Sequence, residues 1–233
     1  MTSAKASGFT GIPAEAFDFY ARLAADNTRA WWSAHRHEYE SFIREPMTAL
    51  LAELEAEFGS GHLYRPHRDT RFSPDKSPLK DHQGAVVQIE DSVGYYVQVS
   101  AAGLMVAGGW YAPQGAQIDR YRKAVDGPAG AELEQLVARL VRTFDMDGQS
   151  LKTAPRGYPA DHNRIGLLRH RALTVARRYG PSPWMGTRTA LRKVRDDWRA
   201  MRPLLEWLAD HIGPGLDPEL DGEQHSTPNR RKR

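Results

Sequence analysis

Three short runs of β-branched and aromatic residues lie close together in the middle of the chain. They are GAVVQIE at residues 84–90, GYYVQVS at 94–100 and GLMVAGGWY at 103–111. The turn-forming residues that separate them are Asp91, Ser92, Gly94 and Gly103. Runs of this length and composition, broken by such turns, are typical of strands that pair in an antiparallel meander. The sequence therefore predicts an antiparallel sheet at the centre of the fold.

Helices are predicted before this sheet because apolar residues recur there at three- and four-residue steps. The first helix is expected at residues 13–25. A second helix, capped by Asp26 or Asn27, is expected to end just before Pro46. Proline suits the first turn of a helix, so a third helix is expected at residues 46–59.

The chain after the meander is predicted to return mostly to helix. The expected elements are helices at residues 117–125, 131–144 and 161–170, a strand or extended loop from residue 151 and a strand from residue 172. Ser182 is expected to cap a long final helix that is interrupted or restarted near Pro203 and stops at Gly213. Together the elements predict an α+β fold, in which a mainly antiparallel sheet of about five or six strands packs against N- and C-terminal helices.

The composition indicates a globular domain. With 233 residues, of which 40% are hydrophobic and 26% charged, the chain can bury a full core without disulfides. We predict a single domain at residues 9–213, a flexible N-terminus at 1–8 and a disordered polar tail at 214–233. The absence of cysteine fits the cytoplasm, and no apolar stretch is long enough for a membrane span or a signal peptide. The oligomeric state stays open.

The stretch RDTRFSPDKSPLK, at residues 68–80, gathers basic and acidic side chains around one phenylalanine. Its arginines are forked donors that suit phosphate or carboxylate oxygens, and its lysines add mobile positive charges. These four cations are Arg68, Arg71, Lys76 and Lys80. They predict a cleft that binds a small anion. The competing interpretation is that Asp69 and Asp75 neutralise the cations within the fold.

A second polar patch, LKTAPRGYPADH, lies at residues 151–162, where two prolines are expected to hold a rigid loop. Its candidate ligand-binding residues are Lys152, Arg156 and Tyr158. If this loop folds over the first stretch, the two form one cleft that also contains Asp69. An aspartate flanked by cations has a lowered pKa and is a poor general base at neutral pH, so binding is favoured over catalysis.

Evidence for an enzyme is weaker. Ser73 with Lys76, and Ser77 with Lys80, have the Ser-x-x-Lys spacing of the penicillin-recognising hydrolases. That chemistry needs both side chains on one helical turn, and the intervening prolines permit a single turn at most. A hydrolase or transferase acting on an anionic substrate stays an alternative. The nine histidines are scattered without ligand spacing, so neither a metal site nor a cofactor is expected.

Charge is distributed unevenly along the chain. Residues 1–59 carry five Lys or Arg and nine Asp or Glu, whereas residues 156–202 carry twelve and three. In one interpretation the arginines of the basic segment are solvated or pair with the acidic segment. In the other it forms an exposed stripe that binds nucleic acid. The arginines of that stripe are Arg169, Arg171, Arg177, Arg178, Arg188, Arg192, Arg195 and Arg199.

Several of these segments together resemble a known family. YRPHRDTRFSPDKSPLK is followed by GYYVQVS and GLMVAGGWY, with FTGIPAEAFDFYARLAADNTRAWW before them and LKTAPRGYPADH after them. This combination is similar to the bacterial family called domain of unknown function 2461, and the similarity extends from Phe9 to about Ile212. The resemblance implies no activity, cofactor or catalytic residue.

Overall fold

A six-stranded antiparallel sheet forms the centre of the computed structural model, which describes residues 8–69, 71 and 74–215. The strand order is β1-β2-β3-β4-β6-β5. The strands are β1 (Gly61–Leu63), β2 (His82–Glu90), β3 (Val93–Ser100), β4 (Gly103–Trp110), β5 (Asp145–Asp147) and β6 (Leu173–Tyr179). The predicted α+β fold is confirmed. The predicted flexible N-terminus and disordered tail lie outside the described residues, except for Gly8, Pro214 and Gly215.

The three predicted central strands form the expected meander. β2 pairs with β3, and β3 pairs with β4 in a register that places Val97 opposite Val106. β6, the strand predicted from residue 172, pairs with the far side of β4. The edge strands β1 and β5 were not predicted individually, because three residues are too few to show a period-two pattern.

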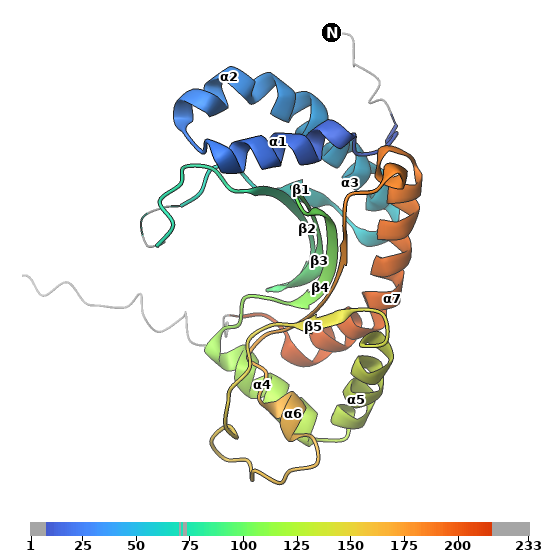
Figure 1. Cartoon of the computed structure of the whole chain (residues 1–233). Coiled ribbons are helices and arrows are strands. Elements are labelled where there is room, and N and C mark those ends of the chain that lie inside the picture. The colour runs from blue at the N-terminus through green and yellow to red at the C-terminus, as the bar shows by residue number, and fades with distance from the viewer. Residues whose placement is uncertain (1–7, 70, 72–73, 216–233) are drawn as a thin grey trace, which may run out of the picture.

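The two faces of the sheet are covered differently. Helix α7 (Thr189–Ile212) packs along the convex face, and the concave face opens on the other side (Figure 1). Gly108 lets α7 approach closely, since a Cβ there would lie 3.1 Å from Leu205 Cδ1 and 3.2 Å from Met201 Sδ. A larger residue at position 108 would push α7 away from the sheet.

The N-terminal helices are α1 (Ala14–Ala25), α2 (Arg29–Tyr39) and α3 (Glu45–Phe58). A π-helical turn, Glu40–Arg44, joins α2 to α3, so the helical backbone continues without a break across the expected boundary at Pro46. The predicted caps Asp26 and Asn27 are wrong. Thr28 Oγ1 accepts the hydrogen bond from Trp31 N at 3.1 Å, because Thr28 directly precedes the first helical residue.

Helices α4 (Gly115–Asp126), α5 (Ala129–Leu140) and α6 (Ile165–Leu168) gather at one end of the sheet (Figure 1). Ser182 does not cap the last helix, because it precedes a separate 3-10 turn, Pro183–Gly186. The predicted interruption at Pro203 is also wrong, since α7 runs through it. Leu204 and Leu205 follow this proline and are fully buried, so packing on the sheet offsets the lost hydrogen bond.

Helices α3 and α7 are joined by ion pairs. Glu57 Oε1 lies 2.6 Å from Arg199 Nε and 3.2 Å from Arg202 NH2, and Arg195 Nε lies 3.6 Å from the other Glu57 oxygen. Glu53 pairs with Arg188 at 2.9 Å. The hydrogen bond from Arg199 is the main cause of the lowered pKa of Glu57. The acidic N-terminal segment therefore neutralises a large part of the basic helix, as the first interpretation of the charge pattern predicted.

Replacing Glu57 by glutamine is expected to lower the free energy of unfolding by up to about 1 kcal/mol at neutral pH, the range of partly exposed ion pairs. Because the folded-state pKa of Glu57 lies below its unfolded value of about 4.3, this stabilisation is present above that value and lost as the pH falls through the folded pKa. Urea denaturation of both proteins across this range measures the difference. Glu55→Gln, at an exposed position of the same helix, is the control. A difference between wild type and Glu57→Gln that is independent of pH would contradict the role of the charge.

Candidate functional site

The chain between β1 and β2 forms an arm that folds back on itself, of which the structure describes residues 64–69, 71 and 74–81. Arg68 N donates to Pro78 O at 2.9 Å, and Lys80 N donates to Pro66 O at 2.8 Å. His67 and Leu79 form an antiparallel bridge between these bonds. Proline lacks an amide hydrogen, so the two prolines contribute only carbonyl acceptors. The arm thereby holds the residues before Arg68 opposite Lys80.

Buried and half-buried side chains anchor the base of the arm. Asn27 makes two hydrogen bonds with the Leu79 backbone, at 3.0 and 3.1 Å. Gln83 Nε2 donates to Tyr64 O at 2.8 Å, and Tyr39 OH donates to Gln83 Oε1 at 2.7 Å. Asn27 and Leu79 are 52 residues apart, so no local pattern in the sequence indicated this contact. The base is consequently held by both the helices and the sheet.

The arm places its predicted acids and arginines in pairs. Arg71 forms hydrogen bonds with Asp69, from Nε at 3.1 Å and from NH2 at 2.8 Å, and both side chains are exposed. The hydrogen bond from Arg71 is the main cause of the lowered pKa of Asp69, which confirms that prediction. Arg68 NH2 lies 3.2 Å from Asp75 Oδ2 and 4.0 Å from Asp81 Oδ1. Neutralisation by acids, the competing interpretation, therefore applies to both arginines.

Arg68 and Lys80 nevertheless retain features of an anion site. Arg68 Nε is buried without a hydrogen-bond partner among the described residues. Lys80 Nζ lies 5.2 Å from the centroid of the Tyr64 ring. Burial lowers the pKa of Lys80, and the positive charges of Arg65 and Arg68 lower it further. Lys80 is thus close enough to both arginines for their charges to repel its own.

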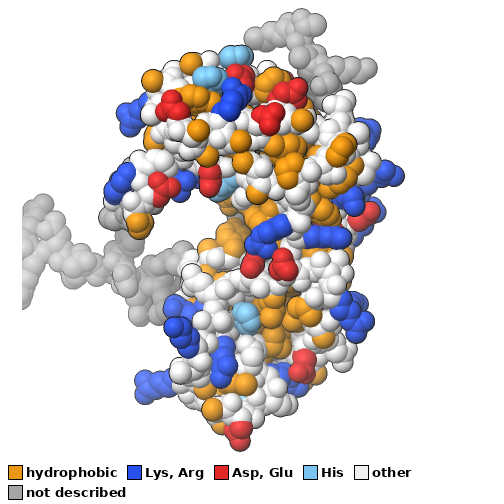
Figure 2. All heavy atoms as spheres, viewed as in Figure 1, with side chains coloured by type: hydrophobic (Ala, Val, Ile, Leu, Met, Phe, Trp, Pro, Cys, Tyr) orange, Lys and Arg blue, Asp and Glu red, His pale blue; other side chains and the backbone are white. Residues whose placement is uncertain are grey.

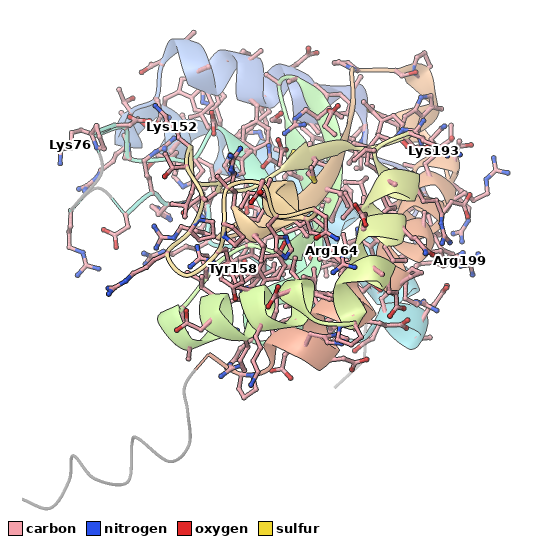
Figure 3. The ribbon with its side chains drawn as sticks, turned by 90° about the horizontal axis from the view of Figure 1, so that it is seen from below. Lys76, Lys152, Tyr158, Arg164, Lys193 and Arg199 are labelled. Carbon is pink, nitrogen blue, oxygen red and sulfur yellow. The ribbon has the colours of Figure 1, made fainter. Side chains whose placement is uncertain are left out.

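The second predicted patch lies at the other end of the concave face. Lys152 and Arg156 are exposed, and Tyr158 is half-buried. Burial and the charge of Asp126 in α4 raise the pKa of Tyr158, and Asp126 also bonds to His162 at 3.0 Å. In Figure 1 the arm lies above the open concave side and this loop lies below it. Figure 3 shows Lys76 and Lys152 on the same side of the molecule. That the two segments form one cleft and bind one ligand stays a prediction.

Between these two segments, the concave face carries a cavity of about 260 Å³, which we call the hollow. Small residues of neighbouring strands form part of its floor, and three tyrosines line it as well. The small residues are Gly94, Ala107, Gly109 and Ala176, and the tyrosines are Tyr64, Tyr96 and Tyr111. Figure 2 shows the molecule indented here, with hydrophobic side chains on the inner wall. Sequence reasoning predicted the strands but not this cavity.

The tyrosines around the hollow are held in place by specific contacts. Tyr96 OH donates to Gln98 Oε1 at 2.8 Å, and its ring centroid lies 6.4 Å from that of Tyr64. Burial raises the pKa of Tyr96. Gly84 leaves room for this ring, since a Cβ there would lie 2.3 Å from Tyr96 OH. Burial, followed by the neighbouring Tyr64, raises the pKa of Tyr111, whose side chain is 42% exposed. The alternation of Tyr95 and Tyr96 within β3 was the one available sequence signal, because it sends one ring to each face.

The opposite wall of the hollow contains an ion pair. Arg178 on β6 lies 2.5 Å from Asp147 and 3.2 Å from Asp145, both on the edge strand β5. Two carboxylates thus compensate one guanidinium at this end. The hollow is therefore basic only towards the arm.

Three further expectations from the sequence concern the Ser-x-x-Lys pairs, metal binding and membrane spans. Ser77 and Lys80 do not share a helical turn, because the arm is extended there, and Ser73 lies outside the described residues. No group of three or more metal-binding side chains was found among the described residues. Within the same part of the chain, no helix is both long and apolar enough to cross a membrane.

The predicted basic stripe is interrupted by acidic partners. Arg177 pairs with Asp197, Arg178 with Asp145 and Asp147, and the α7 arginines pair with Glu53 and Glu57 as described above.

Sequence comparison identifies the family of the chain. No curated protein matches the chain. A family model described as conserved hypothetical protein (DUF2461) matches residues 15–207. This range contains the arm, all six strands and most of α7. The chain therefore belongs to the domain of unknown function 2461 family, as the resemblance of its motifs predicted.

Proposed function

We propose that the protein binds a small organic anion at the base of the arm, between Arg65, Arg68 and Lys80. The observation that carries this proposal is the position of Lys80, whose ammonium lies over the Tyr64 ring and within the field of two arginines. Like charges held close together raise the electrostatic energy of the folded protein. A bound anion removes this repulsion and receives hydrogen bonds from the same groups.

The bonding of Arg68 supports the same location. Its side chain is 24% exposed, whereas its partners Asp75 and Asp81 are 52% and 69% exposed and well solvated. Its buried Nε hydrogen has no acceptor among the described residues. The acids therefore do not fully satisfy this guanidinium, and the exposed part of the side chain can meet an anion.

Binding explains these features better than the two alternative functions do. Asp69, the acid that the sequence analysis placed in the cleft, has a lowered pKa, which disfavours it as a general base. The arginines proposed for nucleic-acid binding are largely engaged with acidic residues. We place the binding reaction in the cytoplasm, because a chain without cysteine fits a reducing compartment.

A thermal-shift screen tests the proposal. Phosphate esters and small carboxylates are expected to raise the melting temperature of the wild-type protein, because a ligand that binds only the folded state stabilises it. Lys80→Met is expected to weaken binding by about tenfold or more, the loss typical of one charged hydrogen bond. Without ligand, this variant is expected to melt no lower than wild type, since the substitution removes the repulsion from Arg65 and Arg68.

Lys123→Met, at an exposed position of α4, is the matched control and is expected to bind like wild type. The proposal is wrong if no anion shifts the wild-type melting temperature, or if Lys80→Met binds the anions as tightly as wild type does.

A further inference from the structure

The floor of the hollow is unusual for an open sheet face. Such a face normally carries polar side chains towards solvent. Here two cross-strand rows place small residues side by side, because Gly94 pairs with Gly109 and Ala107 pairs with Ala176. The first pair joins β3 and β4, and the second joins β4 and β6. The two pairs are neighbours on the sheet, so the space that larger side chains would fill is continuous above them. An apolar floor that is open to solvent is typical of a ligand site.

The walls of the hollow favour a flat ligand. Tyr64, Tyr96 and Tyr111 surround the space, and tyrosine rings bind planar aromatic groups by stacking. The volume of about 260 Å³ is slightly below the range of roughly 300–1,000 Å³ that is common for drug-sized ligands. The space therefore suits a body of one or two fused rings.

The charges define where an anionic group on such a ligand would lie. Tyr64 lines the hollow and also contacts Lys80, so the ring site and the anion site are adjacent. Arg68 at the arm is paired with Asp75, and the two other cations, Arg65 and Lys80, match the charge of a phosphate monoester, which is about −2 at neutral pH. At the opposite wall Arg178 is already engaged by Asp145 and Asp147. The ligand is thus expected to be charged at one end only.

We infer that the natural ligand is a phosphate monoester of a planar aromatic body, with its ring in the hollow and its phosphate at the arm. This inference rests on the proposed function, because Arg65, Arg68 and Lys80 hold the phosphate. It adds the hollow as the second part of the site.

Isothermal titration calorimetry with four probes separates the two parts. Glycerol phosphate and inorganic phosphate report the anion site alone, whereas phenyl phosphate and adenosine monophosphate also offer a ring. We expect at least one aromatic ester to bind about tenfold or more tightly than glycerol phosphate, since stacking on a tyrosine contributes about that factor.

Two variants test where the ring binds. Ala107→Leu is designed to fill the hollow and is expected to reduce the affinity for the aromatic esters to that for glycerol phosphate, which itself stays unchanged. Tyr111→Ala removes a ring that is 42% exposed and is expected to weaken only the aromatic esters, by about tenfold. It keeps the inference testable if Ala107→Leu does not fold. Ile89→Ala, which shortens an apolar side chain outside the hollow that is 39% exposed, is the control and should change neither affinity.

The outcomes distinguish the inference from the proposed function. Equal binding of glycerol phosphate and both aromatic esters to wild type overturns the inference but leaves the anion site standing. An aromatic preference that survives in Tyr111→Ala, and also in Ala107→Leu if that variant folds, overturns it as well, because the ring then binds elsewhere. Binding of no probe overturns both proposals.

Discussion

Replacing Trp198 by alanine is expected to lower the free energy of unfolding by about 3–5 kcal/mol. This indole is fully buried between α7 and the sheet, with its ring centroid 5.2 Å from those of both Phe58 and Tyr95. Its Nε1 donates to Tyr96 O at 3.3 Å. Alanine leaves a cavity where three elements meet. Since domains are typically stable by about 5–15 kcal/mol, this one substitution removes a large part of the total.

Urea denaturation followed by circular dichroism measures this loss. Trp198→Phe is the matched control, because it keeps an aromatic ring against Phe58 and Tyr95 and loses mainly the hydrogen bond to Tyr96. Its expected loss is about 1–2 kcal/mol. A loss in the free energy of unfolding of less than about 1 kcal/mol for the alanine variant would be as small as that of a surface substitution. It would show that the packing of α7 does not depend on this contact.

Gly109→Ala is expected to cost about 3 kcal/mol or more, through strain at a backbone conformation that favours glycine. Gly109 has φ +137°, and a Cβ there would lie 2.3 Å from Leu173 O. That oxygen belongs to the paired strand β6, so relieving the clash means shifting the sheet backbone. We expect a lower melting temperature together with faster amide exchange in β4 and β6.

Gly115→Ala is the control for this substitution. A Cβ at Gly115, the first residue of α4, meets no described atom within 4 Å. Its expected effect on the free energy of unfolding is within about 0.5 kcal/mol. Equal stability of the two alanine variants would show that the strand at Gly109 accommodates a side chain.

The strands of the meander were predictable because their signal is local. Each run has the composition of a strand, and the short turns between runs leave little choice of partner. Helix boundaries were less predictable, since they depend on distant contacts. Asn27 suits a cap, yet its amide bonds to Leu79, and Thr28 caps α2 instead. Pro203 would break an isolated helix, but in α7 the burial of Leu204 and Leu205 dominates.

The candidate site was predictable only in part. The arm residues formed a visible charge cluster, and the lowered pKa of Asp69 followed from its neighbours in sequence. The hollow had no such signal. Several glycines and alanines were visible in the predicted strands, but the sequence does not show whether they face one another across neighbouring strands. The register between the strands decides that.

The sequence by itself determined the α+β class, the central meander, the family and the chemical types present in the arm, because each depends on residues close together in the chain. The tertiary structure decided which charges are neutralised and where open space remains. Glu57 and Arg199 are 142 residues apart, and Tyr64 reaches Tyr96 across Gly84 of the strand between them. The formation of ion pairs and the enclosure of a cavity depend on distances in space, which the order of residues along a chain does not specify.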